Sequence, residues 1–557
     1  MTTPTTKPPS GGPLAAVAAT LGSAVAIAIL SGARESPLTP ALPPGAGASA
    51  PLSSIADLLG LSAAPTSLRA GAAVLLLVAA GGAFLLTARE AWRGALSLRT
   101  IIALALLLHA LAVLVPLLGS HDVYSYIMYG RIDAVYGRNP YLAPPSDFAA
   151  DPLFRFVSPE WRDTPTVYGP VFLWIASWIA RTAGDPSTAI VWFKALAGLS
   201  SVATMLLVAY AARRIAPQRA AFAVAVVGLN PAMIYGAVGG GHVDTLVALG
   251  VAGAFALLAL GDGRNVRRSA PLATGALTLA ALVKVVAALP LALLVGALTW
   301  TAPRGRRGRT LLVHMAIIAA LTVAFGARFA QSSDPTYGLS SLAPYGSHFA
   351  PWLLANRALA PLGGAVAGSA GLEATAVMVR VAFALALALP FVWVLRAVGR
   401  TDRVKDWGAG WSFMLLLAPL TLQLLFPWYL VWCLPVAWLL AHRVRTAALV
   451  LSALFPTVDA IADRFRAPVQ YDGLRILGSY VLAPALLILL LWLLVTLRRK
   501  TRAGARELSS RRLGSAGAGW SPRTGGRDAP DPRTPRSDPA GAAGLPRSTG
   551  RTRGGRC

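Results

Sequence analysis

The chain carries little charge and almost no cysteine. Only 13% of its 557 residues are charged and 55% are hydrophobic, whereas an ordinary soluble domain has about 25% charged residues. The two cysteines lie in an apolar run (Cys433) and at the last position (Cys557). They provide neither a disulfide framework nor a cysteine-based metal site. The composition therefore indicates a membrane protein.

Motifs for nucleotides and for soluble catalysis are also missing. The sequence has no zinc spacing, Walker loop, nucleophile elbow or GxGxxG after a strand, so a soluble nucleotide-sugar site is unsupported. We expect no cofactor and assign no metal ligands, while the sequence leaves metal dependence open. The net charge of +27 does not indicate nucleic acid, because most of it lies in short loops and in the tail.

Long apolar runs dominate what is present. A membrane-spanning helix needs about 20 mostly apolar residues. The pattern predicts an all-α polytopic membrane protein with about 14 transmembrane helices. Region 270–302 is interrupted by Lys284 and Pro290, so one helix and two helices both remain open there. The expected spans are 14–32, 70–88, 99–118, 188–211, 219–238, 242–260, 270–284, 286–302, 310–328, 373–398, 407–425, 427–442, 446–463 and 475–497.

Arginine-rich short loops set the expected orientation. Loops such as 213–219 and 303–309 are basic, and the acids lie mostly in the alternate, longer loops. Basic loops stay in the cytoplasm, so both termini are predicted to be cytoplasmic in a multi-pass protein of the cell membrane. The first apolar run is interpreted as an uncleaved span. Segment 170–183 is short for a span and is expected to lie on the outer face.

The sequence suggests two parts. Residues 1–502 form the expected transmembrane domain, with a first outer loop at 119–187 and a second at 329–372. Residues 503–557 are rich in Gly, Pro, Ser and Arg without apolar periodicity, which predicts a disordered basic cytoplasmic tail. Membrane lipids are the partners that this charge indicates.

The first outer loop concentrates polar and aromatic residues directly after a span. Asp122 stands at the mouth of the expected helix, where partial desolvation raises a carboxyl pKa and suits it to accept a proton from a hydroxyl. Capping of a helix that begins at Val123 explains it equally well. The neighbouring candidates for substrate contact are His121, Tyr124, Tyr126, Arg131 and Tyr168.

Further candidates follow along the outer side. A glycine-rich turn precedes His242 and Asp244 at a helix start, where backbone N–H groups hold anions; helix capping is the alternative. Lys284 interrupts an apolar run, and such a buried amine is a functional-site hypothesis by default; snorkelling to the interface is the alternative.

Arg357 in the second outer loop has a fork that matches phosphate geometry. Trp428 and Tyr429 sit at the expected outer boundary, where an aromatic belt and sugar stacking both account for them.

Taken together, these segments resemble the bacterial polyprenol-phosphomannose-dependent α-1,6-mannosyltransferases, membrane glycosyltransferases of the GT-C fold. The similarity covers roughly residues 100–435. The matching segments are SHDVYSYIMYGR (120–131), NPY (139–141), SPEWRDTPTVYGPVF (158–172), GGGHVDTLVALG (239–250), the segment from Lys284 to Pro290 and FPWYLVW (426–432). Family members often carry Asn where Val243 stands, which puts a direct sugar contact at 243 in doubt.

The resemblance implies a GT-C-like bundle with a long first catalytic outer loop. It implies transfer of mannose from polyprenyl monophosphomannose to a lipid-anchored α-1,6-mannan acceptor, on the outer face and with inversion. One carboxylate base suffices for a single displacement, which suits Asp122. Lys284 and Arg357 are then expected to stabilise the leaving phosphate. The other candidate residues position the sugars or stack on them.

A lipid or glycan transporter (a flippase) is the competing class, because it shares the many spans and buried charges. A GT-C transferase that uses another lipid-linked sugar, or a protein acceptor, is a third possibility. The sequence does not separate these sugars or acceptors, and it is silent on the oligomeric state.

Overall fold

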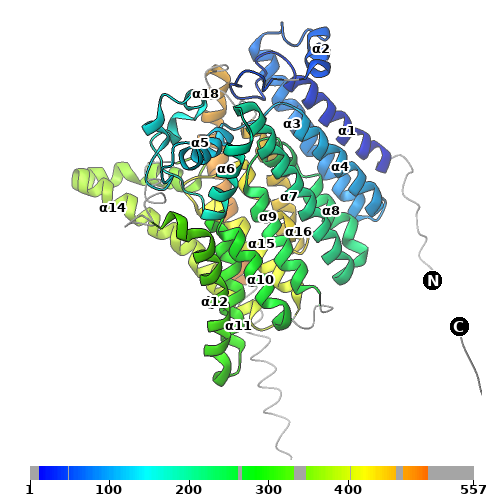
Figure 1. The fold of residues 1–557 in the computed structure, drawn as a ribbon. Coiled ribbons are helices and arrows are strands. Elements are labelled where there is room, and N and C mark those ends of the chain that lie inside the picture. The colour runs from blue at the N-terminus through cyan, green and yellow to red at the C-terminus, as the bar shows by residue number, and fades with distance from the viewer. Residues whose placement is uncertain are drawn as a thin grey trace, which may run out of the picture. The chain divides into compact units, whose positions relative to one another are not determined.

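The computed structural model describes residues 12–47, 49–260, 266–330, 346–401, 403–459 and 468–499. By internal contacts the chain divides into two units, Met1–Thr501 and Arg502–Cys557, and all of the described residues belong to the first. The expected disordered tail, 503–557, lies outside the described residues. Within the described ranges every regular element is helical (Figure 1), which confirms the all-α prediction.

The α-helices run in the order α1 (Gly12–Ser31), α2 (Ala50–Leu58), α3 (Thr66–Trp92), α4 (Leu98–Leu114), α5 (Asp122–Ala134), α6 (Pro170–Thr182), α7 (Pro186–Ile215), α8 (Ala220–Gly228), α9 (Asp244–Leu258), α10 (Val266–Ala281), α11 (Ala288–Thr301), α12 (Arg307–Gly326), α14 (Pro351–Val398), α15 (Val404–Thr421), α16 (Leu434–Ala437), α17 (His442–Leu454) and α18 (Pro468–Leu477). The shorter helices between them include the π-helix η5 (Ala232–Val238) and the 3₁₀ helices η6 (Val285–Ala287), η7 (Arg304–Arg306), η8 (Ala327–Phe329), η9 (Pro427–Trp432) and η10 (Phe455–Asp459).

Seven helices within the described residues are long and apolar enough to cross a membrane. Three shorter apolar helices occur as well: Leu98–Leu114, Asp244–Leu258 and Val285–Thr301. The seven are Gly12–Ser31, Thr66–Trp92, Pro186–Ile215, Pro217–Val238, Arg304–Phe329, Pro351–Val398 and Arg475–Arg499. These apolar helices support a membrane protein, and a total of about 14 crossings stays a prediction.

The apolar stretch 270–302 forms two helices. α10 ends at Ala281, the chain is extended at Lys284, and α11 begins at Ala288 after the 3₁₀ turn η6. The break puts Lys284 between helix ends, not within a continuous helix. The sequence left both one helix and two helices open for this region, and the structure has two helices.

The expected span 427–442 is wrong as a continuous helix. The chain there forms the 3₁₀ helix η9 and the four-residue helix α16. Pro427 and Pro435 lack an N–H for helical hydrogen bonds, which favours such short pieces. Irregular backbone at membrane depth is tolerated where it is buried in protein, and nearly all of this segment is buried.

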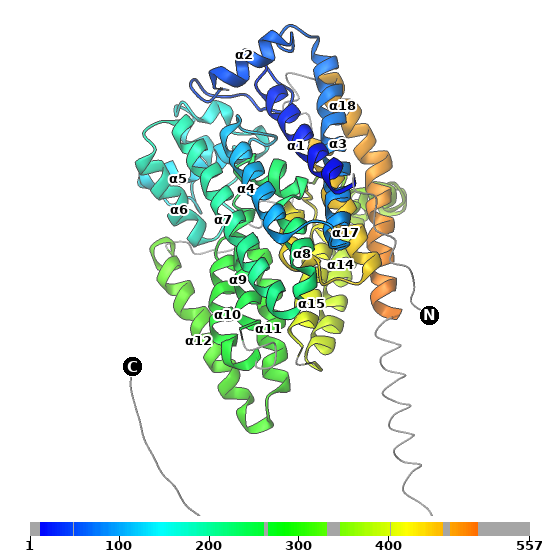
Figure 2. The ribbon, with the colours of Figure 1, turned by 90° about the vertical axis from the view of Figure 1, so that its right-hand side faces the viewer.

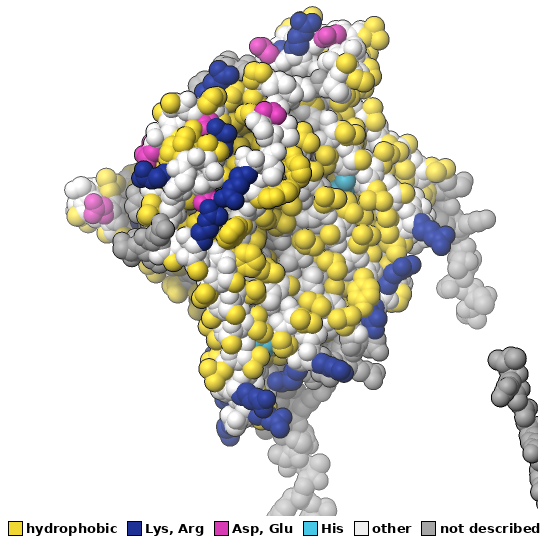
Figure 3. Space-filling view, viewed as in Figure 1, with side chains coloured by type: hydrophobic (Ala, Val, Ile, Leu, Met, Phe, Trp, Pro, Cys, Tyr) yellow, Lys and Arg dark blue, Asp and Glu magenta, His cyan; other side chains and the backbone are white. Residues whose placement is uncertain are grey.

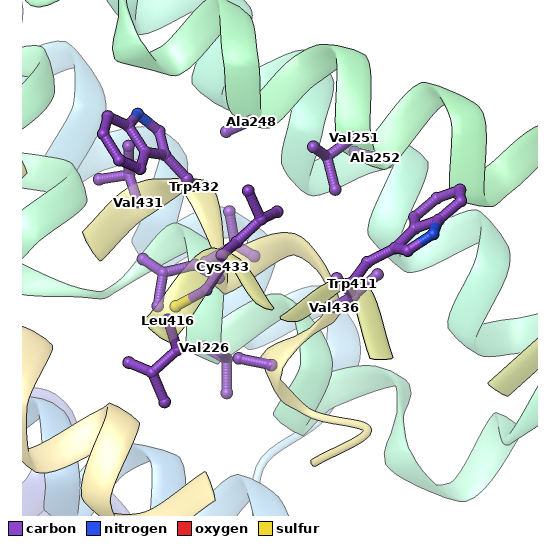
Figure 4. Close-up of a cluster of buried hydrophobic side chains, with 14 of the residues drawn as sticks. Val226, Ala248, Val251, Ala252, Trp411, Leu416, Val431, Trp432, Cys433 and Val436 are labelled. Carbon is purple, nitrogen blue, oxygen red and sulfur yellow. The ribbon is translucent and has the colours of Figure 1, made fainter. Parts of the chain in front are cut away.

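The same segment occupies the centre of the largest apolar cluster (Figure 4). Cys433, Leu416, Val226, Trp411 and Val251 are among the buried side chains of this cluster. Trp411, Trp432 and Cys433 are each at most 1% exposed. Burying large side chains of this kind contributes about 1.5–3 kcal/mol each relative to exposure to water, so the cluster fixes α9 and α15 around the segment.

The first outer loop folds against one end of these helices, and Figures 1 and 2 show α5 and α6 together there. Gly130 of α5 packs on the carbonyl of Ala176 in α6, where a Cβ at Gly130 would approach that oxygen to 2.2 Å. The Gly169 amide donates to the carbonyl of Val283 at 3.0 Å, and the Val171 amide donates to that of Leu282 at 3.0 Å. These backbone bonds hold the loop beside Lys284.

Candidate active site

A cavity of about 280 Å³ lies between the first outer loop, η6 and the segment that leads into η9. Among the described residues, Asp122 and Lys284 are the two charged side chains in its wall. The lining residues are Asp122, Ser125, Tyr126, Tyr129, Trp161, Thr164, Val167, Tyr168, Lys284, Val285, Val286, Leu422, Gln423, Leu424, Phe426, Tyr429 and Trp432. The wall of the cavity is thus mostly apolar and aromatic and carries one carboxylate and one amine. Ligand sites usually combine an apolar lining with a few polar groups in this way.

Asp122 is the first residue of α5 and lies in the cavity wall. The Ser120 hydroxyl accepts a hydrogen bond from the Asp122 amide at 3.0 Å, so Ser120 caps this N–H. The Asp122 side chain is 14% exposed. Burial raises the pKa of Asp122 to about 6, although the nearby charge of Lys284 and the contact with Ser120 act to lower it. A carboxyl with this pKa is suited to take a proton near neutral pH.

His242 lies behind Asp122 in the glycine-rich turn between η5 and α9. Its Nδ1 is 3.7 Å from Asp122 Oδ2 and 3.1 Å from the Tyr126 hydroxyl. Burial, and then the charge of Lys284, hold the pKa of His242 well below its ordinary value. The ring is therefore neutral and supports Asp122 as a polar neighbour, not as a cation.

Trp428 covers the other side of His242. The two rings stack with centroids 3.9 Å apart, and Phe426 stacks on Trp428 at 4.8 Å. Trp428 and His242 line a second, smaller cavity of about 40 Å³. Trp428 thus holds His242 in place and does not line the larger cavity.

Lys284 is paired with a buried carboxylate. Its Nζ donates to Asp244 Oδ1 at 2.8 Å, and the Trp432 indole N–H donates to the same oxygen at 2.7 Å. The Asp244 side chain is 0% exposed and that of Lys284 is 13% exposed. Asp244 therefore fixes Lys284 in the cavity wall and does not line the cavity itself.

Aromatic rings surround the Lys284 ammonium. Its Nζ lies 4.3 Å from the Tyr429 ring centre, 5.2 Å from that of Trp432 and 5.5 Å from that of Tyr168. A desolvated cation over an aromatic face gains about 2 kcal/mol. The arrangement keeps a positive charge at the wall of an otherwise largely apolar space.

The loops that carry Asp122 and His242 are tied together by a buried amine. Lys194 of α7, 2% exposed, donates to the carbonyls of Val115 and Pro116, where α4 ends. Its side chain also lies against Gly241. The Leu118 amide donates to the carbonyl of Gly239 at 3.0 Å. These contacts fix one loop relative to the other.

Four other predicted site residues also lie outside the cavity that Asp122 and Lys284 line. Tyr124 is buried and donates to the Ala41 carbonyl at 2.6 Å. Arg131 is paired with Asp151 at 2.8 Å. His121 is the residue before α5 and its ring lies 5.9 Å from that of Tyr124. Arg357 is exposed on α14 and is not a lining residue.

Several lining residues were not among the predicted site residues. Four of them belong to segments that carry the family resemblance, so the resemblance could have identified them: Tyr129, Trp161, Phe426 and Trp432. Gln423 had no comparable signal, because it enters the wall just beyond the end of α15.

Among the residues that the structure describes, no group of three or more His, Cys, Asp or Glu side chains is arranged to hold a metal. The absence of a resident metal stays a prediction. Among the described side chains that line the cavity, the charged groups are the carboxylate of Asp122 and the amine of Lys284, on a shared wall.

Comparison with known families bears on this site. The model of the alpha-(1->6)-mannopyranosyltransferase family, N-terminal domain, matches residues 19–301, just over half of the chain. The chain belongs to this family. The matched range runs through Asp122 and Lys284, and thus includes both charged groups of the cavity wall.

Individual alpha-(1->6)-mannopyranosyltransferases resemble the chain to different extents. One from Mycobacterium tuberculosis is 28% identical over 412 residues, 63% of this chain and 68% of the relative. One from Corynebacterium glutamicum is 35% identical over 148 residues, 25% of this chain and 28% of the relative. A probable one from Mycolicibacterium smegmatis is 42% identical over 72 residues, and the matched part spans 13% of each chain. No solved structure matches the chain.

Proposed function

We propose that the chain is an inverting membrane mannosyltransferase. It moves mannose from polyprenyl monophosphomannose to a lipid-anchored α-1,6-mannan acceptor on the outer face of the cell membrane. The observation that carries this proposal is the Asp122 carboxylate beside Lys284 on a largely apolar cavity wall, within the segment that the family model matches.

In the proposed reaction Asp122 removes the proton of the acceptor 6-hydroxyl. That oxygen forms a bond to the anomeric carbon of the donor mannose while the bond from this carbon to the phosphate oxygen breaks. Because the donor mannose is β-linked, a single displacement gives an α-linked product. The polyprenyl phosphate leaves with the bonding electrons, and the proton remains on Asp122 until it passes to solvent.

Lys284 is proposed to face the phosphate of the donor, because it is the cation of the cavity wall. A fixed positive charge at the place where negative charge develops lowers the barrier. Asp244 is occupied by Lys284 and Trp432, which supports Asp122 as the single base. Arg357 is not among the residues that line this cavity, so its predicted role at the phosphate has no support from the cavity.

The apolar wall suits a lipid-linked donor. Val285 and Leu422 line the cavity and are still 57% and 40% exposed, so the cavity has an apolar margin at the surface. The proposed polyprenyl chain lies along this margin in the bilayer. The rings of Tyr126, Tyr168 and Tyr429 provide surfaces for the sugars.

The charge distribution supports the proposed orientation. Figure 3 shows acidic and basic side chains together near α2 and α5, while on this face the lower end, at α11 and α12, carries Lys and Arg without acidic side chains beside them. Basic loops face the cytoplasm. The site at α5 is therefore proposed to face outward, with both termini in the cytoplasm.

Transfer of label from radiolabelled polyprenyl phosphomannose to a short α-1,6-mannoside, in membranes that contain the chain, tests the function. The unaltered chain should lengthen the mannoside. Asp122→Asn should lower the rate about 100-fold to 10,000-fold, the usual contribution of a positioned base. Asp147→Asn changes an exposed carboxylate of the same loop outside the cavity, and should leave the rate unchanged.

Near-normal transfer by Asp122→Asn would contradict the role of Asp122. No transfer by any variant would contradict the mannose donor. A panel of lipid-linked pentoses and an assay of lipid flux would then separate another transferase from a transporter, because a transporter needs no base at Asp122.

A further inference from the structure

A second large cavity lies at the opposite end of the helices from Asp122. It is open to the surface and has a volume of about 740 Å³ between α10, α11, η7 and α12. Its lining residues are Arg267, Pro271, Leu298, Thr301, Ala302, Pro303, Arg306, Arg309, Thr310, Val313 and His314. None of them belongs to the wall of the proposed active site, so this cavity has no part in the proposed reaction.

The charge at this cavity is entirely basic. Arg267 comes from α10, and Arg306 and Arg309 come from η7 and the first turn of α12. The sequence contains no Asp or Glu between Asp262 and Asp334, and within the described residues none of the three arginines is paired with a carboxylate. Three guanidinium groups around one cavity, with no carboxylate partner among the described residues, indicate an anionic ligand, since their forks match phosphate oxygens.

One of these guanidinium groups is held in place by the protein. The Nη2 of Arg267 donates to the carbonyl of Thr301 at 3.2 Å and to its hydroxyl at 2.9 Å. Arg267 of α10 is thus fixed against the end of α11. A preorganised donor loses less freedom when a ligand binds than a free surface side chain does.

The cavity changes from basic to apolar along the helices. Pro271, Leu298 and Val313 form the part of the wall away from the arginines. Beside it, Leu272 of α10 and Leu312 of α12 are 64% and 70% exposed. A ligand with an anionic head and a hydrocarbon tail matches this order, because its head meets arginine while its tail lies on leucine.

We propose that this cavity binds the phosphate headgroup of an anionic phospholipid from the leaflet at the basic end of the helices. Basic pockets between transmembrane helices hold such headgroups. Water occupies about 30 Å³ per molecule, so an inorganic phosphate would fill only a small part of the cavity. The headgroup and the first atoms of the acyl chains fill it better.

Native mass spectrometry of the purified full-length chain tests the proposal. Phosphatidylglycerol and phosphatidylcholine with the same acyl chains serve as probes. Phosphatidylglycerol should bind at least about tenfold more tightly, and Arg306→Gln/Arg309→Gln should remove this preference, since charge-assisted hydrogen bonds are roughly twice as strong as neutral ones. Arg443→Gln removes an exposed arginine from the first turn of α17 that does not line the cavity, and should keep the preference.

Two further measurements distinguish binding at this cavity from an unspecific attraction between basic residues and anionic lipids. Arg306→Lys/Arg309→Lys keeps the charge that sets orientation but loses the fork, so its preference for phosphatidylglycerol should weaken; this variant also serves if the glutamine variant fails to fold. Inorganic phosphate should not displace the lipid at equal concentration. An undiminished preference in both double variants, or displacement by inorganic phosphate, would overturn the proposal. None of these measurements depends on mannosyl transfer.

Discussion

At the scale of single residues, the contacts of Lys284 determine what it can do. Its ammonium is already compensated by Asp244, whose second donor is Trp432. The pair is nearly fully buried, and breaking such a pair by removing one partner leaves an uncompensated charge that costs more than the pair contributes.

Asp244→Asn should therefore destabilise the protein by about 3–5 kcal/mol, the usual effect of stranding one buried charge. Thermal unfolding in detergent measures the loss. Asp244→Asn/Lys284→Met should unfold at a higher temperature than Asp244→Asn alone, because no unpaired charge remains. Asp57→Asn breaks the exposed pair with Arg34 and should leave the unfolding temperature unchanged. Equal losses in the single and the double variant would contradict a buried ion pair.

The pKa of Asp122 predicts how the reaction depends on pH. Burial is the largest cause of its rise to about 6, and only the ionised carboxylate accepts a proton. The rate of mannosyl transfer should therefore fall about tenfold per pH unit below about pH 6 and level off above it. Initial rates between about pH 4.5 and 8 with saturating donor measure this profile. A rate that stays constant over this whole range would exclude Asp122 as the titrating base.

The helical period explains which residues at the start of the first outer loop reach the cavity. Asp122, Tyr126 and Tyr129 are spaced by four and three residues and share one face of α5, and all three line the cavity. Tyr124 and Arg131 fall on the opposite face and make other contacts. The sequence identifies the loop that contains these residues. A helix predicted over its start would also have separated the residues that line the cavity from those on the opposite face.

At the scale of the elements, close contacts between backbones position the site. α5 carries Asp122 and packs on α6 through Gly130, where no side chain fits. The sequence predicted a helix over 170–183 but contained no signal for this packing. It also predicted a continuous helix over 427–442, because an apolar run does not distinguish a helix from short turns buried by neighbouring helices.

Gly130→Ala should lower both stability and transfer. Its Cβ would lie 2.2 Å from the Ala176 carbonyl oxygen, so α5 has to move, and overpacking of this kind costs about 1–3 kcal/mol. Thermal unfolding and transfer rates measure the two effects. Gly82→Ala is the matched change in α3, where a Cβ meets nothing within 4 Å, and it should leave both quantities unchanged or improve stability. Wild-type behaviour of Gly130→Ala would contradict the packing of α5 on α6.

At the scale of the whole transmembrane unit, α10 and α12 extend from the end that holds the proposed active site to the end that is rich in arginine. One end of each lies near the proposed active site, where Arg328, just beyond α12, pairs with Asp133 of α5 at 2.8 Å. The other end carries the arginines of the 740 Å³ cavity. His314 is the one buried side chain of α12, and its Nδ1 is 2.8 Å from the Thr274 hydroxyl of α10.

Labelling of intact cells with a membrane-impermeant maleimide tests the proposed orientation. In a Cys557→Ser background the remaining cysteine, Cys433, is buried. Asp163→Cys in the first outer loop should react in intact cells, whereas Gly305→Cys at the basic end should react only after lysis; both positions are exposed. The reverse pattern would place the site in the cytoplasm.

The basic end also couples the protein to the membrane voltage. Six arginines, at positions 267, 268, 304, 306, 307 and 309, lie at this end of α10, α11 and α12, and the stretch from 263 to 333 that contains them has no Asp or Glu. Moving one elementary charge against a potential of about 100 mV, negative inside, costs about 2.3 kcal/mol. Transfer of these six charges to the outside would thus cost more than about 10 kcal/mol. An energised cell membrane therefore holds the inserted chain in its proposed orientation, and loss of that voltage removes part of this hold.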